Sequence, residues 1–265
     1  MEYSLAVQKF IPFILNLYQE QKKQIEQNTT QFIQKYPNEA KSCQKGCGAC
    51  CHFAMIPVTI GEAFVLLNQL IVDGHNLKEL SECLFSYVDK YFKIANKIGN
   101  LPLTEKDQKN FLLEALPCPF FRQDTPNQPM VGHCGIFEIQ PSICIFYHSI
   151  DSPELCAQKK PHRTIDTVMQ KGFSMQNELQ IFERKELGRS AIGHMPLLLA
   201  ALCTTEGLNI FLQEKPLSAA ELKQEYAQEL HDFTFYAELL GAIGYTLSER
   251  DILALSQAQK EIEKL

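Results

Sequence analysis

The chain has 265 residues, of which 45% are hydrophobic and 21% charged, and its formal net charge at pH 7 is −6. These values are typical of a globular protein with one large domain or two small ones. The negative charge offers no attraction to the phosphates of a nucleic acid, so no nucleic-acid partner is expected. Ten cysteines are a high count for this composition and need an explanation.

The beginning of the chain suggests a protein that stays in the cytoplasm. Residues 1–4 carry neither a basic run nor an apolar core, so they do not resemble a signal peptide. The apolar stretch from Phe10 to Leu17 is too short for a membrane span. In a reducing cytoplasm, clustered cysteines serve as metal ligands or catalytic groups more often than as disulfides.

Apolar residues at helical spacing predict that most of the chain is α-helical. The expected helices cover residues 4–36, 59–72, 77–98, 104–115, 163–186, 194–204, 218–241 and 246–265. Thr59 and Glu62 have the spacing of a capping box, and Ser152 precedes Pro153 as an N-cap precedes a first helical residue. Short strands or loops are expected at 135–137 and 143–147.

The expected fold is mainly α, a helical bundle-like protein with a loop-rich, cysteine-ligated metal module and few short strands. The expected divisions are an N-terminal helix at 1–39, the cysteine module at 40–160, and a helical C-terminal region at 161–265, packed as one domain with the rest. The apolar run from Leu197 to Cys203 has no polar face, which predicts a buried core helix.

Four of the cysteines lie within nine residues, in the sequence CQKGCGACC that begins at Cys43 and ends at Cys51. Ionised thiols at such spacing repel one another unless a cation binds them. Thiolates are good ligands for zinc and for iron–sulfur clusters. Gly46 and Gly48 allow the backbone to bend tightly and bring its N–H groups close to sulfur. The segment is therefore predicted to form half of a metal site.

Four later cysteines have surroundings typical of ligand loops. Cys118 lies between two prolines, Cys134 precedes a glycine, Cys144 follows Pro141 by three positions, and Cys156 falls early in a predicted helix. The complete set of predicted metal ligands is Cys43, Cys47, Cys50, Cys51, Cys118, Cys134, Cys144 and Cys156.

The other two cysteines and three histidines are given no ligand role. Cys83 and Cys203 lie among apolar residues of predicted helices, so they are expected to be core thiols. His52, His133 and His148 lie near cysteines in the sequence. Surface or hydrogen-bonded structural roles are expected for them, because eight cysteines already supply enough ligands.

The cysteine blocks follow one another in a fixed order between about residues 40 and 160. They read Gly46-Cys47-Gly48-Ala49-Cys50-Cys51, Cys118-Pro119-Phe120-Phe121, Cys134 to Cys144, Tyr147-His148-Ser149-Ile150-Asp151, and Cys156. In order and spacing this pattern resembles the YkgJ-type family of small bacterial and archaeal proteins, whose domain has a C-x-x-C-C core. The resemblance implies chelation of zinc or iron without a defined reaction. Gln140 and Ile145 replace two arginines of that pattern, which argues against an anion-binding or catalytic role.

The sequence leaves the metal open between zinc and iron, and an iron–sulfur cluster of the 4Fe-4S kind is one form of iron. Cys47 and Cys50 with a later pair fit structural zinc, whereas the Cys-Pro step at Cys118 also occurs in ferredoxin loops. Adjacent Cys50 and Cys51 point in different directions, so they could serve two ions or two edges of one cluster.

Two other functions remain open at this stage. The spacing Cys43-x3-Cys47-x2-Cys50 matches radical S-adenosylmethionine enzymes, but the chain lacks the alternating strands and helices of their barrel. Alternatively, the C-terminal helices could dock a protein partner on a fold that the metal stabilises. No nucleophile–base pair and no phosphate-binding glycine loop is apparent, so no catalytic residue is assigned.

Overall fold

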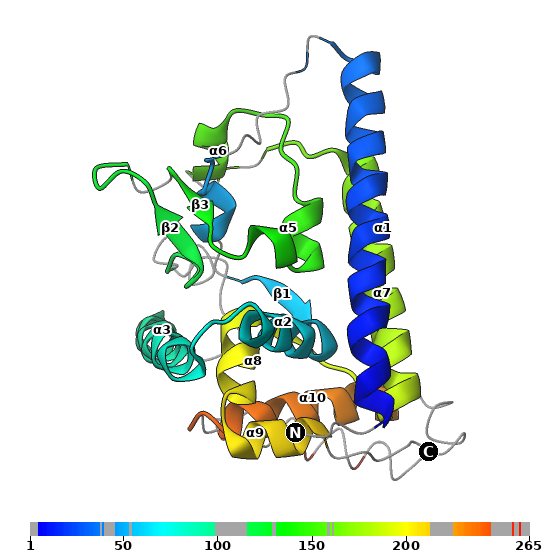
Figure 1. Cartoon of the computed structure of the whole chain (residues 1–265), viewed down its shortest axis with the longest axis vertical. Helices are drawn as coiled ribbons and strands as arrows, with labels where there is room; N and C mark the ends of the chain where they lie inside the picture. Colours follow the sequence, from blue (N-terminus) through cyan, green and yellow to red (C-terminus); the bar gives the residue numbers. More distant parts are fainter. Residues whose placement is uncertain are drawn as a thin grey trace. The chain divides into compact units, whose positions relative to one another are not determined.

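The structure is a computed structural model of the whole chain. It describes residues 5–37, 39, 46–52, 55–98, 116–128, 131–157, 160, 162–212, 225–244, 256 and 260. Within them the fold is mainly α, as the sequence predicts, with nine α-helices and two small antiparallel sheets (Figure 1).

Most of the helices lie close to their predicted positions, but the helices at 142–146 and 205–212 were not predicted. The helices are α1 (Leu5–Lys35), α2 (Ile60–Val72), α3 (Leu77–Ile98), α5 (Ser142–Phe146), α6 (Pro153–Ala157), α7 (Asp166–Leu187), α8 (Met195–Leu202), α9 (Thr205–Leu212) and α10 (Glu225–Gly241), with 3-10 helices at Ala49–His52 and Phe137–Ile139. Strands β1 (Pro57–Thr59) and β4 (Ile192–His194) form one sheet, and β2 (Phe121–Gln123) and β3 (Gly132–Cys134) form the other.

The chain forms two compact units, each assembled from separate stretches. Unit 1 comprises Met1–Ile14, Pro57–Ser81 and Gln176–Leu265, and unit 2 comprises Leu15–Ile56 and Glu82–Met175. Helices α1, α3 and α7 therefore contribute residues to both units. Unit 2 contains the predicted cysteine ligands, and unit 1 draws on both ends of the chain.

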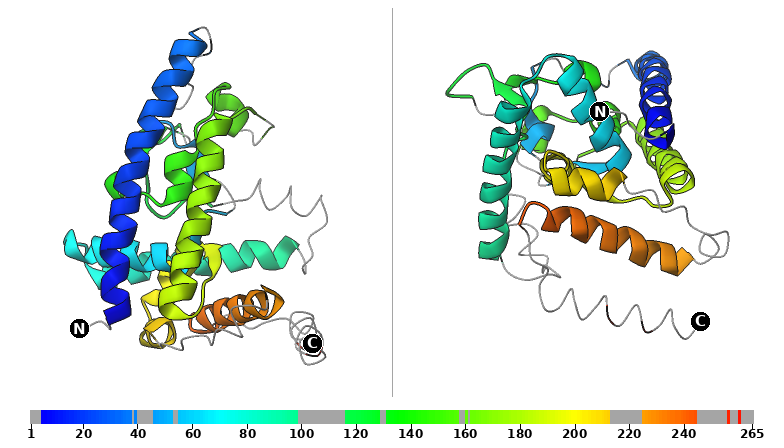
Figure 2. Two further views of the ribbon diagram at one scale, coloured as in Figure 1. Left: turned by 90° about the vertical axis from the view of Figure 1, so that its right-hand side faces the viewer. Right: turned by 60° about the horizontal axis from the view of Figure 1, so that its bottom comes forward.

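Unit 1 is built around α8, whose eight residues are all buried. This burial confirms the core helix predicted from the apolar run that begins at Leu197. Helices α2, α9 and α10 pack against α8, and α10 also lies beside α9 (Figure 2). Strand β4 leads directly into α8 and pairs with β1, so that His194 lies opposite Pro57.

No single helix in the part of the chain that the structure describes is long and apolar enough to cross a membrane. Helices α8 and α9 reach that length and hydropathy only as a pair, and they meet at a bend of 97°. All eight residues of α8 are buried, as expected for the helix at the centre of unit 1.

Polar groups fix the start of α2. The Thr59 hydroxyl accepts the N–H of Glu62 at 3.2 Å, and the Glu62 carboxylate accepts the N–H of Thr59 at 3.0 Å. This is the predicted capping box. The buried Glu183 of α7 accepts the N–H of Gly61 at 2.8 Å and the hydroxyl of Ser190 at 2.6 Å. A carboxyl group buried inside unit 1 thus holds the first turn of α2.

Unit 2 holds the short elements that carry the cysteines. The β2–β3 hairpin places Cys134 opposite Phe121, and Cys47 forms an isolated antiparallel bridge with Val131 just before β3. The 3-10 helix at Ala49–His52 contacts α6. Figure 1 shows the hairpin and α6 gathered around this 3-10 helix.

Of the two short strands or loops predicted in this region, 135–137 is not a strand, and 143–147 is mostly helix and so neither strand nor loop. Residues 135–136 form a turn and Phe137 begins a 3-10 helix, while 142–146 form α5. Pro141 caps α5 in an extended conformation, and an apolar run of five residues does not by itself distinguish strand from helix. The helices predicted at 104–115 and from residue 246 lie outside the described residues, apart from two isolated positions.

Candidate metal centre

Seven of the eight predicted ligands lie in the described part of unit 2, and Cys43 lies outside it. Every cysteine that the structure describes is a free thiol. The seven come from the 3-10 helix and the residues before it, the β2–β3 hairpin, α5 and α6. These stretches lie far apart in the sequence, and the fold of unit 2 brings them together.

Two glycines shape the segment that carries the first thiols. Gly46 has a φ of 93°, a conformation that residues with a side chain rarely adopt. A Cβ atom on Gly48 would lie 2.2 Å from the ring of Phe121, so only glycine lets this ring pack against the backbone. Both positions support the tight bend that the sequence predicts here.

Backbone hydrogen bonds join the stretches around Cys51, Cys118 and Cys134. The N–H of Cys118 donates to the carbonyl of Cys51 at 2.6 Å, and the N–H of Gly135 donates to the carbonyl of Phe120 at 2.8 Å. Burial, with a smaller contribution from the nearby Cys134 thiol, raises the pKa of the Cys118 thiol to about 12. Burial also raises the pKa of Cys134. These thiols are therefore close enough to interact electrostatically.

A cavity of about 470 Å³ lies within unit 2. Four of the predicted ligands line it, namely Cys47, Cys50, Cys144 and Cys156. The rest of its wall comes from α1, through residues that include Lys22 and Ile25, and from residues 137–148. This volume lies in the range typical of small-molecule and cofactor sites.

The thiols on the cavity wall also interact with one another. A hydrogen bond with the Cys51 thiol, together with burial, raises the pKa of Cys50 well above its usual value. Burial raises the pKa of Cys156, and the Cys47 and Cys50 thiols add to this effect. Without a cation, the thiols of Cys50 and Cys156 therefore favour the neutral form.

The three histidines make hydrogen bonds, as expected. The Nδ1 atom of His52 lies 3.0 Å from the carbonyl of Gly48, and the Nδ1 atom of His133 lies 2.8 Å from the Asp124 carboxylate. The Nε2 atom of His148 lies 3.0 Å from a backbone carbonyl of α5, and its ring lines the cavity. Of these three histidines, His148 alone lines the cavity.

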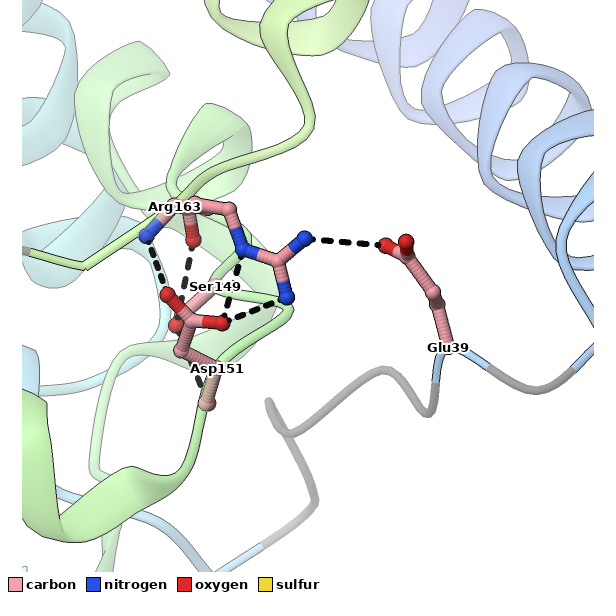
Figure 3. Close-up of polar contacts among 4 residues, drawn as sticks. All are labelled: Glu39, Ser149, Asp151 and Arg163. Carbon is pink, nitrogen blue, oxygen red and sulfur yellow. Dashed lines mark hydrogen bonds and ion pairs between the residues drawn. The ribbon is translucent and has the colours of Figure 1, made fainter.

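A polar cluster fastens the base of the loop that carries α6 and Cys156 (Figure 3). The Arg163 guanidinium donates to the Asp151 carboxylate at 2.8 and 3.0 Å, and the Arg163 N–H donates to it at 2.6 Å. The Ser149 hydroxyl donates to the Asp151 carbonyl at 3.2 Å, and Glu39 lies 3.5 Å from Arg163. Hydrogen bonds from Arg163 lower the pKa of Asp151. Residues 149–151 and 163 are thereby held together.

The structure gives the two remaining cysteines, Cys83 and Cys203, different degrees of burial. Cys83 is exposed, so its predicted core role is wrong. It lies one position before Leu84, outside the buried stripe that includes Tyr87 and Val88. Cys203 is half-buried at the end of α8, on the wall of a cavity of about 200 Å³ in unit 1.

The donor set suits a thiophilic metal, but its side chains are not closed around an ion. Among the described residues, no three histidine, cysteine, aspartate or glutamate side chains are arranged to hold one. Thiolates are nevertheless the preferred ligands of structural zinc and of iron–sulfur clusters.

Sequence reasoning missed the contribution of α1 to the site. The stretch 19–31 is rich in glutamine and mostly polar, yet Gln21, Ile25 and Thr29 are buried, and Lys22 donates to the carbonyl of Glu138 at 2.7 Å. The four-residue spacing of the buried positions was the available signal. Because Gln21 and Thr29 are polar, this spacing does not look like a buried helix face in the sequence.

Comparisons of the chain with models of protein families, with curated proteins and with solved structures found no match. The resemblance to the YkgJ-type family therefore stays a prediction. The interpretation of this site rests on the arrangement of the thiols within unit 2.

Proposed function

We propose that this protein binds zinc or iron through cysteine thiolates of unit 2, as the YkgJ-type pattern implies, in the reducing cytoplasm. One observation carries the proposal. Thiols from three separate stretches, at 47–51, 118–134 and 144–156, belong to one compact unit, and four of them line one cavity. Such a gathering of free thiols is typical of a metal centre when no disulfide forms.

The chemistry of the residues supports the same proposal. Burial and mutual repulsion hold the thiols of Cys50, Cys118, Cys134 and Cys156 in the neutral form. A bound metal displaces those protons and compensates the charge of the thiolates. Bound metal would also cross-link the three stretches, whose strands and helices have only three to five residues each.

The proposal is tested by elemental analysis and visible absorption of protein purified without oxygen. Zinc without colour would indicate a chelating module, and iron with inorganic sulfide and a brown colour would indicate an iron–sulfur protein. Cys47→Ser should lower the metal content and the melting temperature. Cys203→Ser, a control in unit 1, should leave the metal content unchanged. Absence of bound metal after purification and after reconstitution would refute the proposal.

A further inference from the structure

A tyrosine and a histidine of unit 2 form a pair that the order of the sequence does not show. Tyr147 directly follows α5, and His162 lies 15 residues further along the chain. The Tyr147 hydroxyl is within hydrogen-bond distance of the Nε2 atom of His162, and the two rings meet edge to face with their centroids 5.8 Å apart. Both side chains are half-buried. A hydroxyl group beside an imidazole nitrogen is the arrangement of a nucleophile and its base.

Backbone contacts on both sides hold the two residues together. The N–H of Ile150 donates to the carbonyl of Arg163 at 3.2 Å, and the N–H of Ile165 donates to the carbonyl of His148 at 3.0 Å. The ion pair between Arg163 and Asp151 fastens the same two stretches (Figure 3). The residues that immediately follow the tyrosine are thus anchored to those that immediately follow the histidine.

The second nitrogen of the His162 ring determines the direction of the hydrogen bond. Its Nδ1 atom lies 2.7 Å from the carbonyl of Lys160. A carbonyl oxygen can only accept, so in the neutral ring Nδ1 carries the hydrogen and Nε2 keeps its lone pair. The Tyr147 hydroxyl therefore donates to Nε2. A nucleophile, its base and a group that orients the base are all present.

The two members of the pair line different cavities of unit 2. Tyr147 is part of the wall of the 470 Å³ cavity. His162 is part of the wall of a second cavity, of about 660 Å³, to which α1 contributes Phe32 and other residues. A substrate in the first cavity would meet the tyrosine, and water in the second would meet the histidine.

The wall of the first cavity indicates which substrates fit. Apolar side chains, among them Ile25 and Ile145, make up much of it, and its volume suits a small molecule. Lys22 is the one lysine or arginine among the described residues of this wall. Its ammonium group has three donor hydrogens, and the carbonyl of Glu138 accepts one at 2.7 Å. Another can stabilise an oxygen atom that becomes negative during a reaction.

We propose that Tyr147 and His162 are a catalytic nucleophile–base pair that hydrolyses small, uncharged carboxylic esters. The phenol oxygen bonds to the ester carbonyl carbon while Nε2 of His162 takes the phenol proton. The bond from that carbon to the alcohol oxygen breaks, and the alcohol leaves with this proton. Water then gives a proton to His162 and attacks the acyl-tyrosine, which releases the acid and restores the phenol.

This inference goes beyond the proposed metal binding, because neither member of the pair is a thiol and the reaction needs no metal. The two proposals are tested by separate measurements. Bound metal without ester hydrolysis would refute the catalytic pair and keep the proposed function. Ester hydrolysis by a chain that binds no metal would refute the proposed function and keep the pair.

The first test follows hydrolysis of p-nitrophenyl acetate by the purified full-length chain near pH 7. Tyr147→Phe keeps the ring without the hydroxyl, and His162→Gln keeps a hydrogen-bond acceptor without a base. Each should lower kcat/KM by a factor on the order of 10²–10⁴. His75→Gln, an exposed position in unit 1, should leave it unchanged. Unchanged hydrolysis in Tyr147→Phe, or acetyl groups found by mass spectrometry on cysteines alone, would overturn the proposal.

A second measurement separates activation of the tyrosine from a purely structural hydrogen bond and starts from the unaltered chain. N-acetylimidazole transfers an acetyl group to tyrosine hydroxyls, and mass spectrometry gives the rate at each position. Half-buried Tyr147 should react faster than Tyr36, which is 41% exposed, because only the former has a base beside it. In His162→Gln this order should be reversed. Slower acetylation of Tyr147 than of Tyr36 in the wild-type chain would mean that His162 does not activate it.

Discussion

Among single residues, Glu183 stands out because its carboxyl group is fully buried in unit 1, with 0% exposure. Burial raises its pKa from 4.5 to about 8, and the neighbouring Glu62 carboxylate adds to the rise. Hydrogen bonds from Ser190, Thr59 and Gly61 act in the opposite direction without cancelling it. The folded protein therefore keeps this group protonated at neutral pH.

The pH dependence of stability follows from that shift. Between pH 4.5 and about 8, the folded state binds a proton at Glu183 that the unfolded state has released. The free energy of unfolding therefore falls as the pH rises through this window. Glu183→Gln should remove that fall, a difference on the order of a few kcal/mol. Urea unfolding across the window measures it.

The matched control for this experiment is Glu178→Gln, an exposed position on the same helix. It should reproduce the pH dependence of the wild-type protein, because an exposed carboxyl group carries no comparable desolvation. The same slope of unfolding free energy against pH in wild type and Glu183→Gln would contradict the role given to burial.

Reactivity should distinguish the two cysteines that are not assigned as ligands. Cys83 is exposed, whereas burial raises the pKa of Cys203 to about 11. The thiolate is the reactive form, so iodoacetamide near pH 7 should modify Cys83 well before Cys203. Mass spectrometry of the digested protein reports both sites. Faster modification of Cys203 would mean that its cavity is open to the reagent.

At the scale of elements, the start of α2 depends on one glycine. A Cβ atom on Gly61 would lie 2.4 Å from the Glu183 carboxyl oxygen and 3.0 Å from the ring of Phe10. Gly61→Ala should therefore destabilise the protein by about 1–3 kcal/mol, as overpacking commonly does. Gly241→Ala in α10 meets no atom within 4 Å. It should be neutral or stabilising by up to about 1 kcal/mol. Thermal unfolding of both variants provides the comparison.

The helices were predictable because apolar spacing repeats over many residues, as in α3, whose limits at Leu77 and Ile98 match the prediction. The strands could not be predicted from the sequence. Strands β1 and β4 have three residues each and pair across more than a hundred residues of sequence. Such a pair depends on tertiary packing and leaves no local pattern. In the segment 143–147, by contrast, a short apolar run that resembles a strand forms helix α5.

For the whole molecule, the sequence named the thiols but not their grouping. Clustering from Cys43 to Cys51 and the later blocks identified the ligand candidates. The gathering of the thiols in unit 2 depends on contacts such as the hydrogen bond between Cys118 and Cys51, which joins stretches far apart in the sequence. The wall that α1 gives to the cavity, through Lys22 and Ile25, could not be read from spacing between cysteines.

If unit 2 binds a metal as proposed, removal of that metal should affect the two units unequally. The elements that carry the thiols are too short to be stable alone, whereas α8 is buried by apolar packing. A strong chelator should therefore raise amide hydrogen exchange at 47–52 and 118–157 and leave the α8 amides protected. Exchange measured by mass spectrometry, with and without chelator, gives the comparison. Equal loss of protection in α8 would mean that the metal stabilises the whole chain as one unit.

The division of the chain into interleaved units also sets an order of events during synthesis. Unit 2 ends at Met175, whereas unit 1 needs Gln176 onward, including β4 and α8. A ribosome releases the chain from its N-terminus at about 5–20 residues per second. All the thiols of unit 2 thus emerge seconds before β1 finds its partner strand. If unit 2 binds a metal as proposed, the nascent chain can take up that metal while unit 1 is still incomplete.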